Sequence, residues 1–266
     1  MRTFNQAGFL FRVIFVSNFG GILIMLSILN KEISGFFSSL VAYITIGVFL
    51  LVMGLLLWVF PDSSILDYGY AGLDSLFNTA PYVFMFLIPA ITMRSLAEEK
   101  KEGTFELLAT RPLTDWQIVG GKYLASLFIA LFALVPTLIY YITVYQLGAV
   151  KGNIDTGAVI GSYIGLFLLG GAFAAIGIFS SSVTKNQIIA FAISVFLCFI
   201  SFIGFDSISQ ILSLQSIDTY ITAIGINQHY QSISRGVLDT RDLVYFLSFI
   251  ALFLVITKTV VGGRKW

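Results

Sequence analysis

Charged side chains are scarce in this chain. Only 11% of its 266 residues are Asp, Glu, Lys or Arg, whereas 58% are hydrophobic and the mean hydropathy is +0.93. A soluble domain carries about 25% charged residues, so this composition predicts an integral membrane protein. The net charge of +1 gives no indication of a nucleic-acid partner. The length suits one polytopic membrane domain without a separate soluble catalytic domain.

Cysteine and histidine are almost absent. Cys198 is the single cysteine and stands in an apolar run, which excludes an internal disulfide and a cysteine-rich metal site. His229 is the single histidine, which argues equally against a histidine-based metal site. Gly120-Gly121-Lys122 lacks the earlier glycine, the following Ser or Thr and the preceding strand of a phosphate loop. Since no paired catalytic groups are visible either, we expect neither an enzyme nor a cofactor bound by this chain.

Long apolar runs dominate the sequence instead. Five stretches of membrane-spanning length contain no charged residue, and a sixth is interrupted only by Lys258, which can reach the membrane surface from near a helix end. The six runs cover residues 33–61, 75–93, 123–150, 156–184, 186–205 and 243–263. They are continuously apolar rather than alternating, which favours helices over a β-barrel. The sequence therefore predicts an all-α polytopic membrane protein with six transmembrane helices.

Lysine and arginine are divided unequally between the two sides of these spans. With the N-terminal end placed in the cytoplasm, most bases fall on the inner side. These inner bases are Lys31, Arg94, Lys100, Lys101, Arg111, Lys122, Lys185, Arg264 and Lys265, with Lys258 nearby, whereas the outer ones are Lys151, Arg235 and Arg241. Because cytoplasmic loops carry the excess of bases in membrane proteins, we expect both termini in the cytoplasm.

The N-terminal region contains an amphipathic stretch that begins at Met25. Ser27 and Lys31 lie on one helical face, and Leu29 and Ile33 lie on another, which is typical of an interfacial helix on the membrane surface. Three interpretations compete for residues 1–24: a signal peptide, a seventh span, or sequence upstream of the true start. A seventh span would reverse the topology against the charge bias. We therefore favour a start at Met25, with 1–24 as a non-native extension and 25–266 as the membrane domain.

The segment 206–242 is partly apolar although it lies outside the predicted spans. Polar residues interrupt it too often for it to cross a bilayer. It can dip into the outer half of the membrane as a re-entrant segment, which requires protein to cover its irregular backbone. The alternative is a lid of amphipathic helices on the outer surface.

A dense polar hairpin follows the second span. Residues 94–106 hold four of the 14 acids and three of the 15 bases of the chain. Gly103 can end one helix and Thr104 can cap the next, which Pro112 ends. A capping box at 114–117 then begins the third span. The sequence predicts a short capped helix across the ends of two spans; the alternative is a solvated loop that only fixes topology.

Residues 93–122 strongly resemble the cytoplasmic loop of type-2 ABC exporter permeases. The shared pattern is an acidic-basic run, Gly-Thr, a Glu-Leu-Leu helix, a proline and a lysine that opens the third span. The resemblance implies an inner-membrane permease subunit in which residues 104–110 form a coupling helix seated on a cytoplasmic ATP-binding subunit. The implied contact residues are Glu98, Glu99, Lys100, Lys101, Glu102, Gly103, Thr104, Phe105, Glu106, Leu108, Arg111 and Pro112.

Three outer motifs, at 152–157, 204–209 and 232–246, are similar to the gliding-motility-associated permease subunits within that family. The resemblance implies a second permease copy or a relative as a further partner, besides the lipid bilayer and an auxiliary outer-side protein. ATP hydrolysis is then expected in a separate subunit. A different class of function is a membrane anchor that transports nothing and serves an ATPase-driven motility or secretion assembly.

Overall fold

The computed structural model describes residues 25–66, 70–109, 113–148, 150–212 and 222–263. Within these ranges every regular element is a helix, and six helical segments are long and apolar enough to cross a membrane. The six segments are Leu40–Trp58, Asp74–Glu102, Asp115–Leu147, Thr156–Val183, Gln187–Ser209 and Thr240–Gly262. The predicted all-α architecture with six spans is therefore confirmed.

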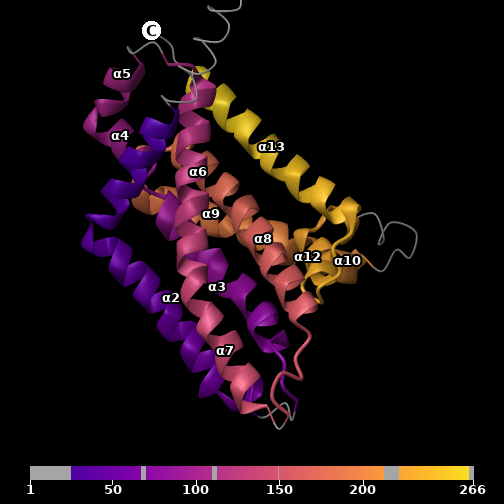
Figure 1. The fold of residues 1–266 in the computed structure, drawn as a ribbon. Helices are drawn as coiled ribbons and strands as arrows, with labels where there is room; N and C mark the ends of the chain where they lie inside the picture. Colours follow the sequence, from indigo (N-terminus) through magenta and orange to yellow (C-terminus); the bar gives the residue numbers. More distant parts are fainter. Residues whose placement is uncertain (1–24, 67–69, 110–112, 149, 213–221, 264–266) are drawn as a thin grey trace, which may run out of the picture.

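The helices of these spans carry the labels of Figure 1. They are α2 (Leu40–Trp58), α3 (Asp74–Thr92), α6 (Asp115–Leu134), α7 (Leu138–Leu147), α8 (Thr156–Val183), α9 (Gln187–Phe199) and α13 (Thr240–Gly262). A 3-10 turn at Val135–Thr137 joins α6 to α7, because Pro136 cannot continue the α-helical hydrogen bonds. The α-helical hydrogen bonding of the third span is thus interrupted at Pro136.

Helix α8 forms the centre of the bundle and packs against α3, α6, α9 and α13. Its glycines permit this close packing. A Cβ atom at Gly161 would lie 2.8 Å from the carbonyl oxygen of Gly236, and one at Gly177 would overlap the Thr92 side chain. Small residues let helix backbones approach one another in a membrane, so the glycine-rich stretch of α8 serves packing within the chain.

The first apolar run forms two helices rather than one. A helix at 25–37 ends at a turn, and α2 begins after Ser39, whose hydroxyl accepts a hydrogen bond from the Val41 amide. The charge-free run began at residue 33 because residues 33–37, at the end of this first helix, carry no charge. A separate helix therefore precedes the first span, as the amphipathic pattern predicted, while residues 1–24 lie outside the described part.

The predicted re-entrant segment contains short helices packed on the bundle. Helix α9 continues through a π-helical turn at Ile200–Gly204 into α10 (Phe205–Leu212), and α12 (Ile226–Ile233) packs against α8 and α13. The Tyr230 hydroxyl donates to the carbonyl oxygen of Phe77 at 2.7 Å. Burial raises the pKa of Tyr230 well above its usual range, so the phenol remains a neutral donor. Residues 213–221 of this segment are not described.

Candidate functional site

The polar hairpin lies at one end of the bundle, beside the C-terminal end of α13 (Figure 1). It consists of α4 (Ala97–Glu102) and α5 (Thr104–Ala109). Helix α3 ends at Thr92, and a turn at residues 93–96 separates it from α4. The hairpin is therefore distinct from the helix of its span.

Gly103 makes the sharp connection between the two short helices. Its φ of 72° and ψ of 3° lie in the left-handed region, which glycine adopts without steric cost. Thr104 is the first residue of α5 rather than the residue before it, and its hydroxyl donates to the Glu99 carbonyl at 3.4 Å. The predicted boundary is thus confirmed, while Thr104 closes the turn from inside the helix.

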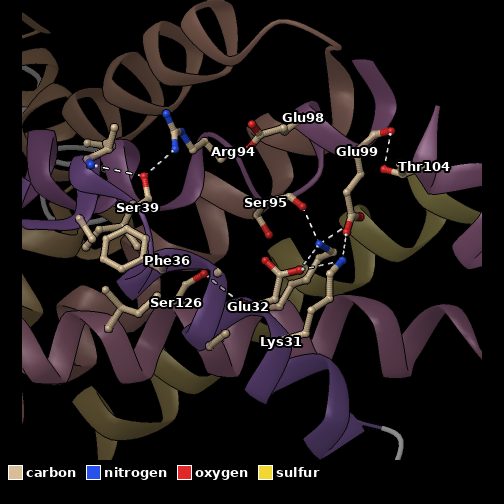
Figure 2. Close-up of a pocket in the computed structure, with 18 of the residues that line it drawn as sticks. Lys31, Glu32, Phe36, Ser39, Arg94, Ser95, Glu98, Glu99, Thr104 and Ser126 are labelled. Carbon is tan, nitrogen blue, oxygen red and sulfur yellow. Dashed lines mark hydrogen bonds and ion pairs between the residues drawn. The ribbon is translucent and has the colours of Figure 1, made fainter. Parts of the chain in front are cut away.

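A cluster of four charged side chains ties the hairpin to the rest of the protein (Figure 2). The Lys122 side chain has no exposed surface, and its Nζ lies 2.7 Å from Glu32 Oε1 and 3.0 Å from Glu99 Oε2. Lys31 Nζ lies 2.8 Å from Glu99 Oε1. Lys31 and Glu32 come from helix 25–37, Lys122 comes from α6, and Glu99 comes from α4. We call Lys31, Glu32, Glu99 and Lys122 the charge cluster.

The charge cluster is a tightly satisfied group rather than a loose surface pair. Lys122 also donates to the carbonyl oxygen of Ser95 at 2.6 Å, in the turn between α3 and α4. A buried ammonium is strongly unfavourable unless opposite charges and hydrogen bonds surround it. The contacts of Lys122 therefore bring helix 25–37, α6 and the root of the hairpin together.

A cavity of about 400 Å³ opens next to the charge cluster. Its lining includes Phe36 on helix 25–37, Ser126 on α6, Arg94 in the turn before α4 and Glu98 on α4. Arg94 reaches across it toward α2, with Nη1 3.3 Å from the Ser39 hydroxyl oxygen. Arg94 and Glu98 thus face the space between the hairpin and the first two helices.

The other side of the hairpin packs against a buried apolar cluster. Phe105 is 7% exposed and belongs to a small buried cluster with Leu96, Val119, Ile178 and Val261. Lys100 lies over the Phe105 ring with its Nζ 5.7 Å from the ring centre, and it also donates to the Ser182 carbonyl. Residues from α6, α8 and α13 therefore support the start of α5.

The remaining predicted contact residues divide into three groups. Lys101, Glu102, Thr104 and Glu106 are exposed, and Glu102 and Thr104 also line the cavity beside the charge cluster. Leu108 lies within α5, but its side chain is not described, and residues 111 and 112 fall outside the described part. The described residues of α4–α5 thus include an exposed polar outer surface.

Sequence reasoning missed the charge cluster as a unit. Lys31 was assigned to the polar face of a surface helix, and Lys122 to the membrane boundary. The signal was the position of Lys122 itself, because a lysine seven residues into a long apolar helix needs a partner. The capping box before this helix was predicted correctly, with Thr114 and Gln117 bonded reciprocally.

Comparisons with known proteins match most of this bundle. A family model described as "ABC-2 family transporter protein" matches residues 61–257. Two curated relatives are each named "Probable multidrug ABC transporter permease YbhR", one from Escherichia coli strain K12 and one from Escherichia coli O157:H7. Each is 28% identical over 134 residues, which cover 50% of this chain and 33% of the relative. The match thus spans about a third of the length of these relatives.

Proposed function

Because this chain belongs to the ABC-2 family of transporter proteins, we propose that it is the membrane-spanning permease subunit of an ATP-driven exporter. The observation that carries this proposal is the hairpin α4–α5. It combines an outer surface of exposed polar side chains with an inner side fixed to four helices of the bundle: helix 25–37, α6, α8 and α13. Such a segment suits a docking contact for a separate ATP-binding subunit.

In the proposed mechanism, closure of the ATP-binding subunits pushes on the outer surface of α4–α5. The push reaches helix 25–37 and α6 through the charge cluster, because Glu99 contacts Lys31 and Lys122 at once. The push reaches α8 and α13 through the buried apolar cluster around Phe105. The exposed charges Lys101, Glu102 and Glu106 orient the docked partner more than they add affinity.

The proposed assembly lies in the inner membrane, with this chain paired with a second copy or a related permease. The base-rich end that carries α4–α5 faces the cytoplasm, since the positive-inside rule favours that orientation. The outer motifs at 152–157, 204–209 and 232–246 support assignment to the gliding-motility-associated group.

Two substitutions in the hairpin test the coupling role. Gly103→Pro cannot adopt the observed φ of 72°, since proline fixes φ near −65°. Glu106→Lys places a cation in the first turn of α5 and reverses a charge on the outer surface. We expect both variants to insert normally and to lose ATP-driven activity or co-purification of the ATP-binding subunit. Lys151→Glu, at an exposed position in the loop before α8, is the control and should behave as the wild type.

Normal assembly and coupled ATP turnover in both hairpin variants would leave α4–α5 as a loop that fixes topology. ATP turnover in the same membranes distinguishes an exporter from the alternative, a membrane anchor that transports nothing. An exporter should show ATP turnover stimulated by its substrate, whereas an anchor should respond only to its assembly partners.

A further inference from the structure

Helix α4 has no cap of its own. The residue at its N-cap position is Leu96, which offers no side-chain acceptor, although Ser, Thr, Asp and Asn are the usual capping residues. The first amide groups of a helix have no partner within the helix and must find one elsewhere. Leu96 and Ala97 have no exposed surface, so water does not supply that partner.

The missing cap comes from a different span. Ser181, in the last turn of α8, accepts hydrogen bonds from the Leu96 amide at 2.9 Å and from the Ala97 amide at 3.0 Å. Its hydroxyl donates in turn to the carbonyl oxygen of Met93 at 3.1 Å, at the end of α3. A serine hydroxyl offers one donor and two acceptor sites, and these three contacts use all of them.

The neighbouring serines make no comparable link. Ser180 is equally buried, but its hydroxyl donates to the Ile176 carbonyl within α8. The Ser182 hydroxyl likewise donates within its own helix, to Phe179. Of these three consecutive serine hydroxyls, that of Ser181 alone has contacts that cross between helices, and these contacts join the end of α3 and the beginning of α4 to α8.

Helix α8 also has a polar contact near its other end. The Ser162 hydroxyl donates to the carbonyl oxygen of Ser234, just beyond α12, at 2.8 Å. At 1.5 Å per residue, Ser162 and Ser181 lie about 28 Å apart along one helix. One rigid element therefore joins the root of the hairpin to the segment at the opposite side of the bundle.

We propose that Ser181 is a positioning residue for coupling, which makes α4–α5 and α8 move together and so carries the motion to α12. This inference rests on the proposed function, in which α4–α5 receives the push. The position of the hairpin then depends on α8 as well as on the span that precedes it, since a turn at residues 93–96 separates α3 from α4. The exposed face of the hairpin takes no part in this contact.

The test compares Ser181→Ala with Ser180→Ala in the full chain bound to its ATP-binding subunit. Each variant removes one buried hydroxyl from adjacent positions of the same helix. Hydrogen exchange at the Leu96 and Ala97 amides should rise by more than about tenfold in Ser181→Ala and stay unchanged in Ser180→Ala. Ser181→Thr retains the hydroxyl and should restore slow exchange.

A second measurement follows the motion itself. An environment-sensitive fluorophore at Val237→Cys, which is exposed beyond α12, reports the far end of α8, and the native Cys198 is buried and stays unlabelled. Trapping the nucleotide should change its signal in the wild type, Ser180→Ala and Ser181→Thr, while Ser181→Ala should bind and hydrolyse ATP with a clearly smaller change, because the contacts of Phe105 and Lys100 with α8 remain.

Equal signals in Ser181→Ala and Ser180→Ala, or unchanged exchange at Leu96 and Ala97, would overturn this inference and leave the proposed function intact. A wild-type complex that shows no nucleotide response at all would overturn the proposed function and the inference together.

Discussion

At the scale of single residues, Lys122 contributes most to the arrangement of the hairpin. Replacing it with methionine keeps the volume but leaves Glu32 and Glu99 without their shared cation. Breaking a buried ion pair on one side destabilises a protein by roughly 3 kcal/mol. We expect Lys122→Met to unfold at a clearly lower temperature in detergent. Lys101→Met, at an exposed position, is the control and should unfold at the same temperature as the wild type. Equal unfolding temperatures for Lys122→Met and Lys101→Met would contradict this role of the charge cluster.

Gly177 offers a second test at this scale. Alanine there would place its Cβ against the Thr92 side chain, between α8 and α3. Because both helices are tightly packed, we expect Gly177→Ala to destabilise the protein by roughly 1 to 3 kcal/mol. Gly47→Ala in α2 meets no atom within 4 Å and should be neutral or slightly stabilising, since alanine favours helix. Thermal unfolding of the two variants gives the comparison, and a stable Gly177→Ala would show that the two helices can separate.

At the scale of elements, α12 is fixed to α3 by one buried hydrogen bond from Tyr230. Tyr230→Phe keeps the ring and leaves the Phe77 carbonyl without its donor, which costs about 1 to 2 kcal/mol. We expect faster hydrogen exchange across Ile226–Ile233, with the six spans unchanged. Tyr43→Phe removes a hydroxyl from a 63% exposed tyrosine and is the matched control. Unchanged exchange in α12 would mean that its apolar contacts alone hold it.

Most elements could be predicted from the sequence because membrane spans are long and continuously apolar. The exceptions have local physical causes. The turn at 93–96 was missed because the acceptor that stabilises it, Ser181, lies more than 80 residues away. The charge cluster was missed for the same reason, since Lys122 and Glu32 are separated by 90 positions. Short-range signals such as Gly103 and the 114–117 capping box were read correctly, because their partners lie within a few residues.

At the scale of the whole molecule, topology is the open prediction. Lys101 and Lys151 are exposed in segments on either side of the third span. With the base-rich end inside, a membrane-impermeant thiol reagent applied to whole cells should label Lys151→Cys and spare Lys101→Cys. The buried Cys198 contributes no background. Labelling of Lys101→Cys alone would reverse the orientation and remove the contact proposed for the ATP-binding subunit.

The position of the charge cluster along the chain has a consequence for synthesis. Each partner of Lys122 comes before it: Glu32 by 90 residues and Ser95 by 27, with Glu99 following Ser95 closely. When the third span leaves the ribosome, the groups that neutralise its ammonium have already been made. In a chain truncated at residue 155, Lys122 should therefore resist amine-reactive reagents, and Glu32→Ala combined with Glu99→Ala should expose it. The third span can thus enter the bilayer with its lysine already neutralised, before α8 exists to enclose it.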